Sequence, residues 1–161
     1  VRPEDLYLVV APTNSPAGSV QVSARSVETG VHKLHTLGVD LRRVVLGSGR
    51  APIAPPHPDP MVMLGRTNDM LLYGAEVFLT MDMTLDELVE VVRTAPSSSS
   101  RDYGVSVAEK VLEVGPEFLY RVDPGFFAPA RYVVCSSDGR CVEAGRVNPE
   151  VLAKSIGLGG V

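Results

Sequence analysis

YVVCSSDGRCVEA, residues 132–144, is the stretch that decides which kind of sheet this chain of 161 residues forms. Two apolar runs, Tyr132–Cys135 and Cys141–Ala144, flank a polar stretch in which Gly139 can adopt the left-handed backbone of a tight turn. The pattern predicts two antiparallel strands joined by a three-residue loop, Ser137–Gly139. A sheet that contains this hairpin cannot be purely parallel.

The predicted hairpin brings the two cysteines of the chain, Cys135 and Cys141, opposite each other. Two cysteines are too few for a disulfide scaffold, and a reducing cytosol favours two free thiols. A disulfide, or a metal ion held by the pair, is the alternative.

Outside the hairpin, strand and helix patterns follow one another along the chain. Short apolar runs predict strands at 6–10, 41–46 and 76–81. Apolar residues that recur every three or four positions predict helices at 16–38, 68–73, 85–95, 105–114 and 149–157, with a stiff proline-rich loop at 51–60. The expected fold is therefore α/β, with α+β as the alternative, in which helices pack on a mixed sheet and a hairpin and a helix end the chain.

Residues 84–100 carry two local signals. The run Thr84–Glu87 has the spacing of a capping box, which predicts the start of a helix that Pro96 ends. The four serines Ser97–Ser100 indicate either a linker, which their short run favours, or a loop that binds a ligand through its hydroxyls and amides.

The length and the net charge of the chain limit the functional classes to which the protein can belong. The length fits a single domain over residues 1–161. A net charge of −4 with scattered basic residues argues against nucleic-acid binding. No run reaches the ~18 apolar residues that span a bilayer, and no signal peptide is recognisable, so we expect a cytoplasmic protein without membrane partners. Val1 in place of methionine suggests a segment of a longer polypeptide.

Four polar residues, Arg25, Glu28, His32 and His35, fall on one stripe of the predicted helix 16–38, because each residue turns the helix by about 100°. Arg25 and Glu28 are three apart and can meet, and a guanidinium keeps a carboxylate ionised and oriented. Spacing alone favours a solvated ion pair over a catalytic one. The histidines lack the spacing and the acidic third ligand of a zinc helix, so we expect no metal site.

Six blocks of sequence occur in the order and spacing of one known family. They are Ala11–Thr13 with Ala17–Gly30, Ala51–Pro55, Gly65–Asp69 with Tyr73–Gly74, Pro96–Ser98 with Asp102–Gly104, Asp123–Gly125 with Phe127–Ala130, and Asn148–Leu152. These blocks resemble methenyltetrahydromethanopterin cyclohydrolase, an enzyme of one-carbon metabolism in methanogens, related archaea and methylotrophs. Members of that family are longer, and this chain resembles their C-terminal half.

The resemblance implies a reaction and a set of site residues. The reaction is the reversible addition of water across the cationic methenyl bridge of a pterin, which gives the 5-formyl compound. Glu28 matches the family's catalytic glutamate, a base, and Arg25 matches the arginine that tunes it. The residues implied to bind the pterin are Gly18, Ser19, Gln21, Arg66, Asn68 and Asp69. No metal or cofactor is implied, because the bridge carbon is already electrophilic and the pterin is the substrate.

The resemblance also carries expectations about partners. The family's pterin pocket lies between two domains, so we expect this chain alone to be inactive without the N-terminal half and to retain part of a homotrimer. Arg50 and Arg66 are the candidates to contact the anionic tail of the pterin, with ordinary surface arginines as the alternative. The competing functions are a non-catalytic binding or assembly module and a paralogue that acts on another pterin.

Overall fold

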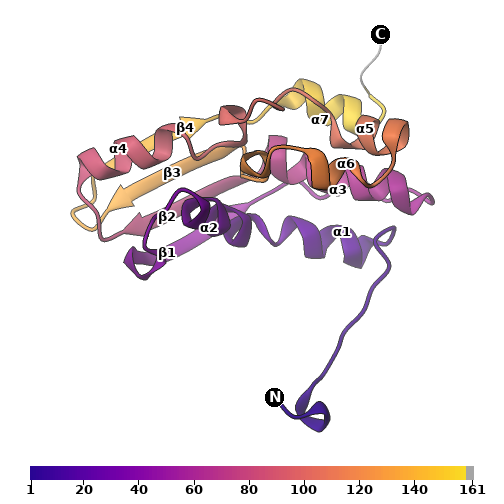
Figure 1. The fold of residues 1–161 in the computed structure, drawn as a ribbon, viewed down its shortest axis with the longest axis horizontal. Coiled ribbons are helices and arrows are strands. Elements are labelled where there is room, and N and C mark those ends of the chain that lie inside the picture. The colour runs from indigo at the N-terminus through magenta and orange to yellow at the C-terminus, as the bar shows by residue number, and fades with distance from the viewer. Residues whose placement is uncertain (159–161) are drawn as a thin grey trace.

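A computed structural model describes residues 1–158, in which four strands form one sheet in the order β1-β2-β3-β4 (Figure 1). The strands are β1 (Val44–Arg50), β2 (Glu76–Met81), β3 (Arg131–Ser136) and β4 (Cys141–Gly145). The outer pairs β1/β2 and β3/β4 are antiparallel, and the central pair β2/β3 is parallel. The sheet is therefore mixed, and the predicted α/β class is confirmed.

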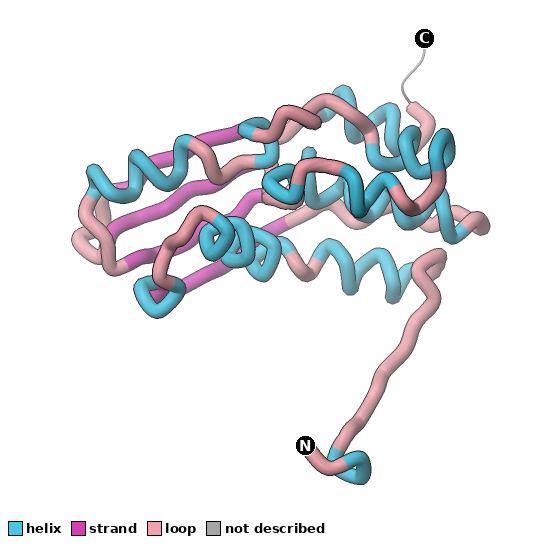
Figure 2. Tube along the Cα trace, viewed as in Figure 1, coloured by secondary structure: helices cyan, strands magenta, loops and turns pink. Residues whose placement is uncertain are grey.

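Some of the helices form a layer against the sheet, and the others form a separate cluster. They are α1 (Pro16–Ser23), α2 (Ser26–Thr36), α3 (Pro60–Gly74), α4 (Leu85–Arg93), α5 (Val107–Val114), α6 (Phe118–Arg121) and α7 (Pro149–Ser155). In Figure 2 the strands occupy one end of the elongated molecule, and most helical residues occupy the other. None of the helices within residues 1–158 combines the length and the apolar character that crossing a membrane requires.

The core has two main parts. In the first, Leu34 of α2 and Leu88 and Val92 of α4 pack against Leu79 of β2 and Val134 of β3, so both helices cover the same face of the sheet (Figure 1). In the second, α3, α5 and α7 pack around Tyr73 and Phe126. The second cluster extends past the end of the sheet, and the cavity described below is built partly from it.

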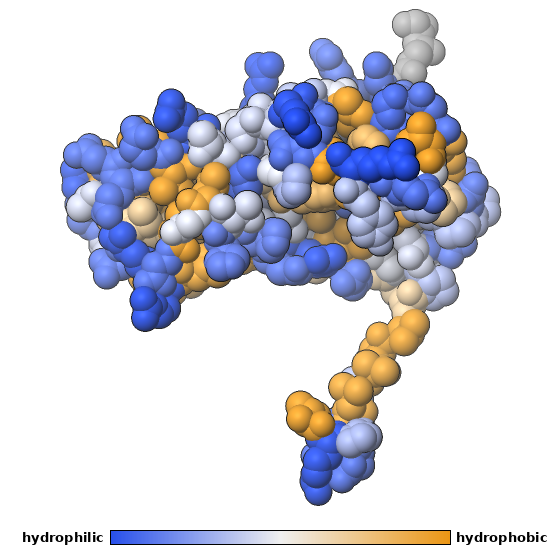
Figure 3. Space-filling view, in the orientation of Figure 1, coloured by the Kyte–Doolittle hydropathy of each residue, from blue (hydrophilic) through white to orange (hydrophobic). Residues whose placement is uncertain are grey.

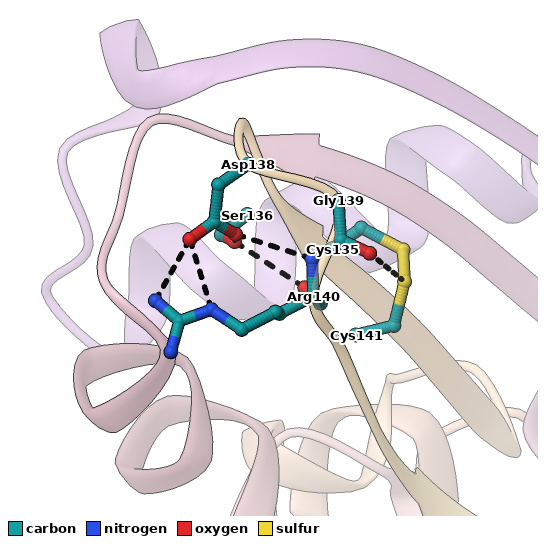
Figure 4. The surroundings of a disulfide bond; sticks show 6 residues. All are labelled: Cys135, Ser136, Asp138, Gly139, Arg140 and Cys141. Carbon is teal, nitrogen blue, oxygen red and sulfur yellow. Dashed lines mark hydrogen bonds and ion pairs between the residues drawn. A yellow bond between two sulfur atoms is a disulfide. The ribbon is translucent and has the colours of Figure 1, made fainter.

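The hairpin forms as the sequence predicts, because the Ser136 amide donates to the Arg140 carbonyl at 2.8 Å and Gly139 has φ +88°. The expectation of free thiols is wrong, because Cys135 and Cys141 are joined by a disulfide (Figure 4). The strand register places the two residues directly opposite each other, with their Cα atoms 3.9 Å apart. This register brings the two sulfur atoms within bonding distance. The expectation of free thiols rested on the reducing cytosol and did not take this geometry into account.

The predicted strand at 6–10 is wrong. Leu6–Val10 is an extended segment outside the four-stranded sheet, and Tyr7 and Val9 are 89% and 100% exposed. Figure 3 shows it as an apolar arm that stands away from the rest of the molecule. An apolar run becomes a strand only where another strand edge offers hydrogen bonds, and no edge within residues 1–158 does so here.

The single helix predicted for 16–38 is two helices with a break at Ala24 and Arg25. Each half is held by a different part of the chain. Ser23 of α1 donates to the carbonyl of Pro52 in the proline-rich loop, whereas α2 packs on the sheet beside Gly47 and Gly49. Apolar spacing continues across the break, so periodicity alone does not reveal it.

The boundaries of the other helices and strands differ less from the predicted ones. β1 begins at Val44 because residues 41–43 form a 3₁₀ turn capped by Asp40, and it continues to Arg50. α3 begins at Pro60, well before the predicted start at residue 68. The sequence pattern missed this start because several faces of the helix are buried, which blurs the amphipathic pattern. Ser97–Ser99 form a 3₁₀ turn in which the buried Ser97 hydroxyl donates to the Leu72 carbonyl, so this run is not a loose linker. The capping box at Thr84 and the strand at 76–81 are confirmed.

Candidate functional site

A cavity of about 530 Å³ lies between α2, α3 and the segment 119–127. The α2 side is polar and presents Arg25, Glu28, Thr29 and His32. The opposite walls are mainly apolar and come from α3 and from the later segment, with Leu64, Leu71, Leu119, Tyr120, Val122 and Phe127 among their residues. A pocket with one polar wall and mainly apolar opposite walls is typical of a site for a small organic ligand.

Arg25 and Glu28 form a bidentate ion pair, as their spacing predicts. The guanidinium donates from Nε to Glu28 Oε2 and from Nη2 to Oε1, both at 2.7 Å. Arg25 immediately precedes α2 and Glu28 lies in its first turn, where the helix dipole also favours a negative charge. The hydrogen bond from Arg25 lowers the pKa of the Glu28 carboxyl below its usual value, against a smaller opposing effect of burial.

The surroundings of this pair distinguish it from an ordinary surface ion pair. The Arg25 and Glu28 side chains are 48% and 61% exposed, which alone would indicate solvation. A comparable pair, Lys110 with Glu113 on α5, is also three residues apart, and Glu113 is equally exposed at 61%. The difference is that Arg25 and Glu28 line the 530 Å³ cavity, and Lys110 and Glu113 do not.

Lys33 joins α2 to the segment that forms the far wall of the cavity. This lysine is almost completely buried, and its Nζ donates to the Gly125 carbonyl at 2.7 Å. Burial lowers the pKa of its amine, while Asp123 acts in the opposite direction. The neighbouring residues Pro124 and Phe127 line the cavity, so this hydrogen bond holds two of its walls together.

Of the two α3 residues at 68 and 69, only Asn68 reaches the cavity, and its Nδ2 donates to the Leu64 carbonyl. Asp69 is buried and caps α5 by accepting hydrogen bonds from the amides of Val107 and Ala108 and from the hydroxyl of Ser106. Burial raises the pKa of Asp69, and these hydrogen bonds oppose the rise.

The residues of α1 implied by the resemblance do not line the cavity. Ser19 is buried and donates to the Ala54 carbonyl at 2.7 Å, while Gln21 is exposed and outside the cavity lining. A Cβ atom at Gly18 would clash with the carbonyl oxygen of Pro12. Gly18 therefore permits the close approach of Pro12 and the following Thr13, and Thr13 does line the cavity.

Both arginines expected at the tail of a ligand are engaged elsewhere. Arg66 donates from Nε to the Ser155 carbonyl at 2.9 Å and so ties α3 to the end of α7. Arg50 on β1 forms an ion pair with Glu76 at 2.7 Å. Neither side chain lines the cavity.

Some residues that line the cavity were not predicted from the sequence. Tyr120 is 91% exposed and presents an aromatic ring at the cavity, yet it lies in a stretch without a recognisable block. Thr13 and Phe127 fall inside the resembling blocks, but neither was expected in the site. Within residues 1–158, no three His, Cys, Asp or Glu residues gather closely enough to hold a metal ion.

Comparison with known proteins shows the family to which the chain belongs. Residues 1–156 match the family model described as "Cyclohydrolase (MCH)". The methenyltetrahydromethanopterin cyclohydrolase of Methanococcoides burtonii is 42% identical over 98% of this chain and 50% of its own length. The proteins of the same name from Rhodopirellula baltica and Methylobacterium organophilum are 45% and 41% identical, over 98% and 96% of this chain and 48% of their own lengths. The chain thus spans about half the length of these relatives, and it belongs to the cyclohydrolase (MCH) family.

Proposed function

We propose that this chain carries the catalytic pair of a methenyltetrahydromethanopterin cyclohydrolase, which adds water across the cationic methenyl bridge of the pterin and yields the 5-formyl compound. The observation that carries the proposal is the bidentate Arg25–Glu28 pair in the wall of a 530 Å³ cavity. Family membership supports the same reaction, since the matching relatives are named for it.

The reaction requires one group that moves protons. Water attacks the bridge carbon, which shares its positive charge between two nitrogens, and the Glu28 carboxylate accepts the proton that the water loses. The same group then donates a proton to the departing nitrogen as the carbon–nitrogen bond breaks. Loss of the hydroxyl proton of the adduct leaves the formyl group, so one proton is released overall. The negative charge of Glu28 also favours the cation in the cavity.

Arg25 has a different role, which is to keep Glu28 ionised and aimed. Its two 2.7 Å hydrogen bonds engage both carboxylate oxygens, so the charged form of Glu28 is favoured. Arg25 and Glu28 together would present a base with a lowered pKa on the polar wall, opposite the apolar walls that receive the rings of the pterin.

Replacing Arg25 by glutamine is expected to move the pH dependence of turnover. Because the hydrogen bond from Arg25 is the largest cause of the lowered Glu28 pKa, its loss raises that pKa. The base is then protonated up to a higher pH, so the acidic limb of the pH–rate profile shifts upward. Arg93→Gln, which removes an exposed arginine of an ion pair on α4, is the control and leaves the profile in place. An unshifted profile for Arg25→Gln contradicts the assigned role.

Replacing Gly18 by leucine is expected to weaken pterin binding more than it lowers the melting temperature. The new side chain must displace the backbone of Pro12 and Thr13, which is exposed and contributes little to the core, but Thr13 lines the cavity. Titration of the pterin and thermal melting of both proteins measure the two effects. Unchanged binding would show that this close approach does not shape the site.

We also propose the setting in which the chain acts. The relatives are about twice as long as the segment they share with this chain, so activity requires the polypeptide that corresponds to their other half. By family resemblance the protein is a cytoplasmic homotrimer, it takes the pterin as substrate, and it needs no cofactor.

The loss of absorbance of the methenyl chromophore tests the proposal directly. We expect no turnover by the chain alone and turnover when it is combined with the other half, either as a separate chain or in one polypeptide. Binding of the pterin by the combined halves without turnover would instead support the non-catalytic module. Full turnover by the chain alone would refute the need for a second half.

A further inference from the structure

Lys33 of α2 is a buried charged residue that the proposed reaction does not use. It is 5% exposed, and lysine is almost never buried to this extent unless its ammonium group has a partner. Its Nζ donates to the Gly125 carbonyl at 2.7 Å. Pro124 and Phe127 line the cavity on that side, whereas Lys33 itself does not line it. The lysine therefore reaches behind the cavity lining, from the helix that carries Glu28 to the segment opposite.

This contact is the hydrogen-bonded link between the two walls. Within residues 1–158, no other hydrogen bond joins α2 to the segment 119–127. The helix packs mainly on β1 and β2, so the sheet positions α2 but not the segment that faces it. The separation between the wall with Glu28 and the wall with Tyr120 therefore depends on Lys33.

The segment 119–127 has a second anchor, which does not involve α2. The Asp123 amide donates to the Asp102 carboxylate at 2.7 Å. The Asp123 carboxylate accepts from the Ser100 hydroxyl at 2.7 Å and from the Gly125 amide at 2.9 Å. These contacts remain if Lys33 is replaced. Loss of the lysine should therefore leave the segment folded but less well fixed relative to α2.

Gly125 leaves the space that the ammonium group needs. A Cβ atom at this position would lie 3.1 Å from Lys33 Nζ and 3.2 Å from Asp123 Oδ1. Both distances are shorter than an ordinary van der Waals contact, so a larger residue would displace the amine or the carboxylate. The fit of the amine against the segment thus depends on glycine at residue 125.

We propose that Lys33 is a positioning residue of the pterin site, which holds the apolar wall at the separation from Glu28 that the flat rings of the pterin need. The inference rests on the proposed function, because it takes the pterin as the ligand. A wall that is fixed before the ligand arrives binds it more tightly than one that must first be ordered. Lys33 acts through this wall, so it affects binding and not the proton transfers.

The test is Lys33→Met in the whole protein with both halves present. Methionine fills the space of the aliphatic stem but donates no hydrogen bond. We expect the pterin dissociation constant and KM to rise about tenfold while kcat falls less than about threefold, because the wall holds substrate and transition state alike. The acidic limb of the pH–rate profile should stay in place, since Arg25 and Glu28 are unchanged. Loss of the base itself would give the reverse, with a large fall in kcat.

Arg43→Met is the matched control. Arg43 donates from Nε to the Asp82 carbonyl at 2.7 Å, so it is also a cationic side chain that joins two distant segments, but it lies outside the cavity. This variant should keep the wild-type pterin affinity. Thermal melting of both variants sets an assay temperature at which each is fully folded, so that a loss of stability is not read as a loss of binding.

A double-mutant cycle tests the contact between Lys33 and Gly125. Gly125→Ala should weaken pterin binding because its Cβ displaces Nζ, and it should have little further effect once residue 33 is methionine. Unchanged pterin affinity of Lys33→Met overturns the positioning role, as do equal weakening by Arg43→Met, a fall in kcat alone, or fully additive effects of the two substitutions.

The proposed reaction fails in a different way. Wild-type protein that binds the pterin without turnover refutes the reaction, and the dissociation constants of the variants still decide the role of Lys33. Wild-type protein that binds no pterin overturns both proposals.

Discussion

Replacing Glu28 by glutamine is expected to lower turnover of the assembled enzyme by roughly 10²–10⁴-fold, which is the usual contribution of a positioned acid or base. Glutamine keeps the size of the side chain and can still accept one hydrogen bond from Arg25, but it cannot take a proton from water. Binding of the pterin should weaken much less than turnover, because the shape of the cavity is unchanged. The measurement is the turnover number from loss of the methenyl chromophore, with the pterin dissociation constant determined in parallel.

Glu113→Gln is the matched control for this experiment. Glu113 also pairs with a basic residue three positions away, and its side chain has the same 61% exposure as Glu28, but it lies outside the cavity. It is expected to retain wild-type turnover, and both variants should unfold within about 0.5 kcal/mol of wild type, as exposed ion pairs do. Wild-type turnover with Glu28→Gln would return the Arg25–Glu28 pair to an ordinary surface role and leave the base unidentified.

Replacing Asp69 by alanine should have the largest effect on stability, lowering the free energy of unfolding by about 3 kcal/mol or more. The buried carboxylate accepts hydrogen bonds from the Val107 and Ala108 amides and the Ser106 hydroxyl, at 2.8–3.1 Å. Alanine leaves these donors without a partner in a dry interior. Denaturant unfolding measures the loss. Asp59→Ala is the control, since Asp59 caps α3 from an exposed position and its loss should cost about 1 kcal/mol.

Asp69 also makes a specific contribution to the pH dependence of stability. Burial raises its pKa, so the folded state binds this proton more tightly than the unfolded state does. Its contribution to the free energy of unfolding therefore falls as pH rises from the ordinary aspartate pKa through the raised one. Asp69→Asn removes that contribution. An Asp69→Ala protein as stable as wild type would show that Asp69 does not hold α5, and its role would then have to be sought at a ligand.

Local signals in the sequence were sufficient for elements whose geometry a few neighbouring residues control. The hairpin follows from Gly139 and the two flanking apolar runs, and the start of α4 follows from the capping box at Thr84. The contact between Arg25 and Glu28 follows from their spacing of three residues in a segment predicted to be helical. In each case the interacting groups lie within 14 residues of each other, so no distant part of the chain is needed to bring them together.

Only the tertiary structure decided the other features of the fold and of the site, because each of them depends on a contact with residues far away in the sequence. Leu6–Val10 has the composition of a strand, but within residues 1–158 no strand edge accepts it. A carboxylate at Asp69 suits a ligand site or a helix cap equally well, and only the approach of α5 to α3 assigns it to the cap. Likewise the Arg25–Glu28 pair is determined by spacing alone, whereas the cavity around it exists only because α3 and the segment 119–127 fold against α2.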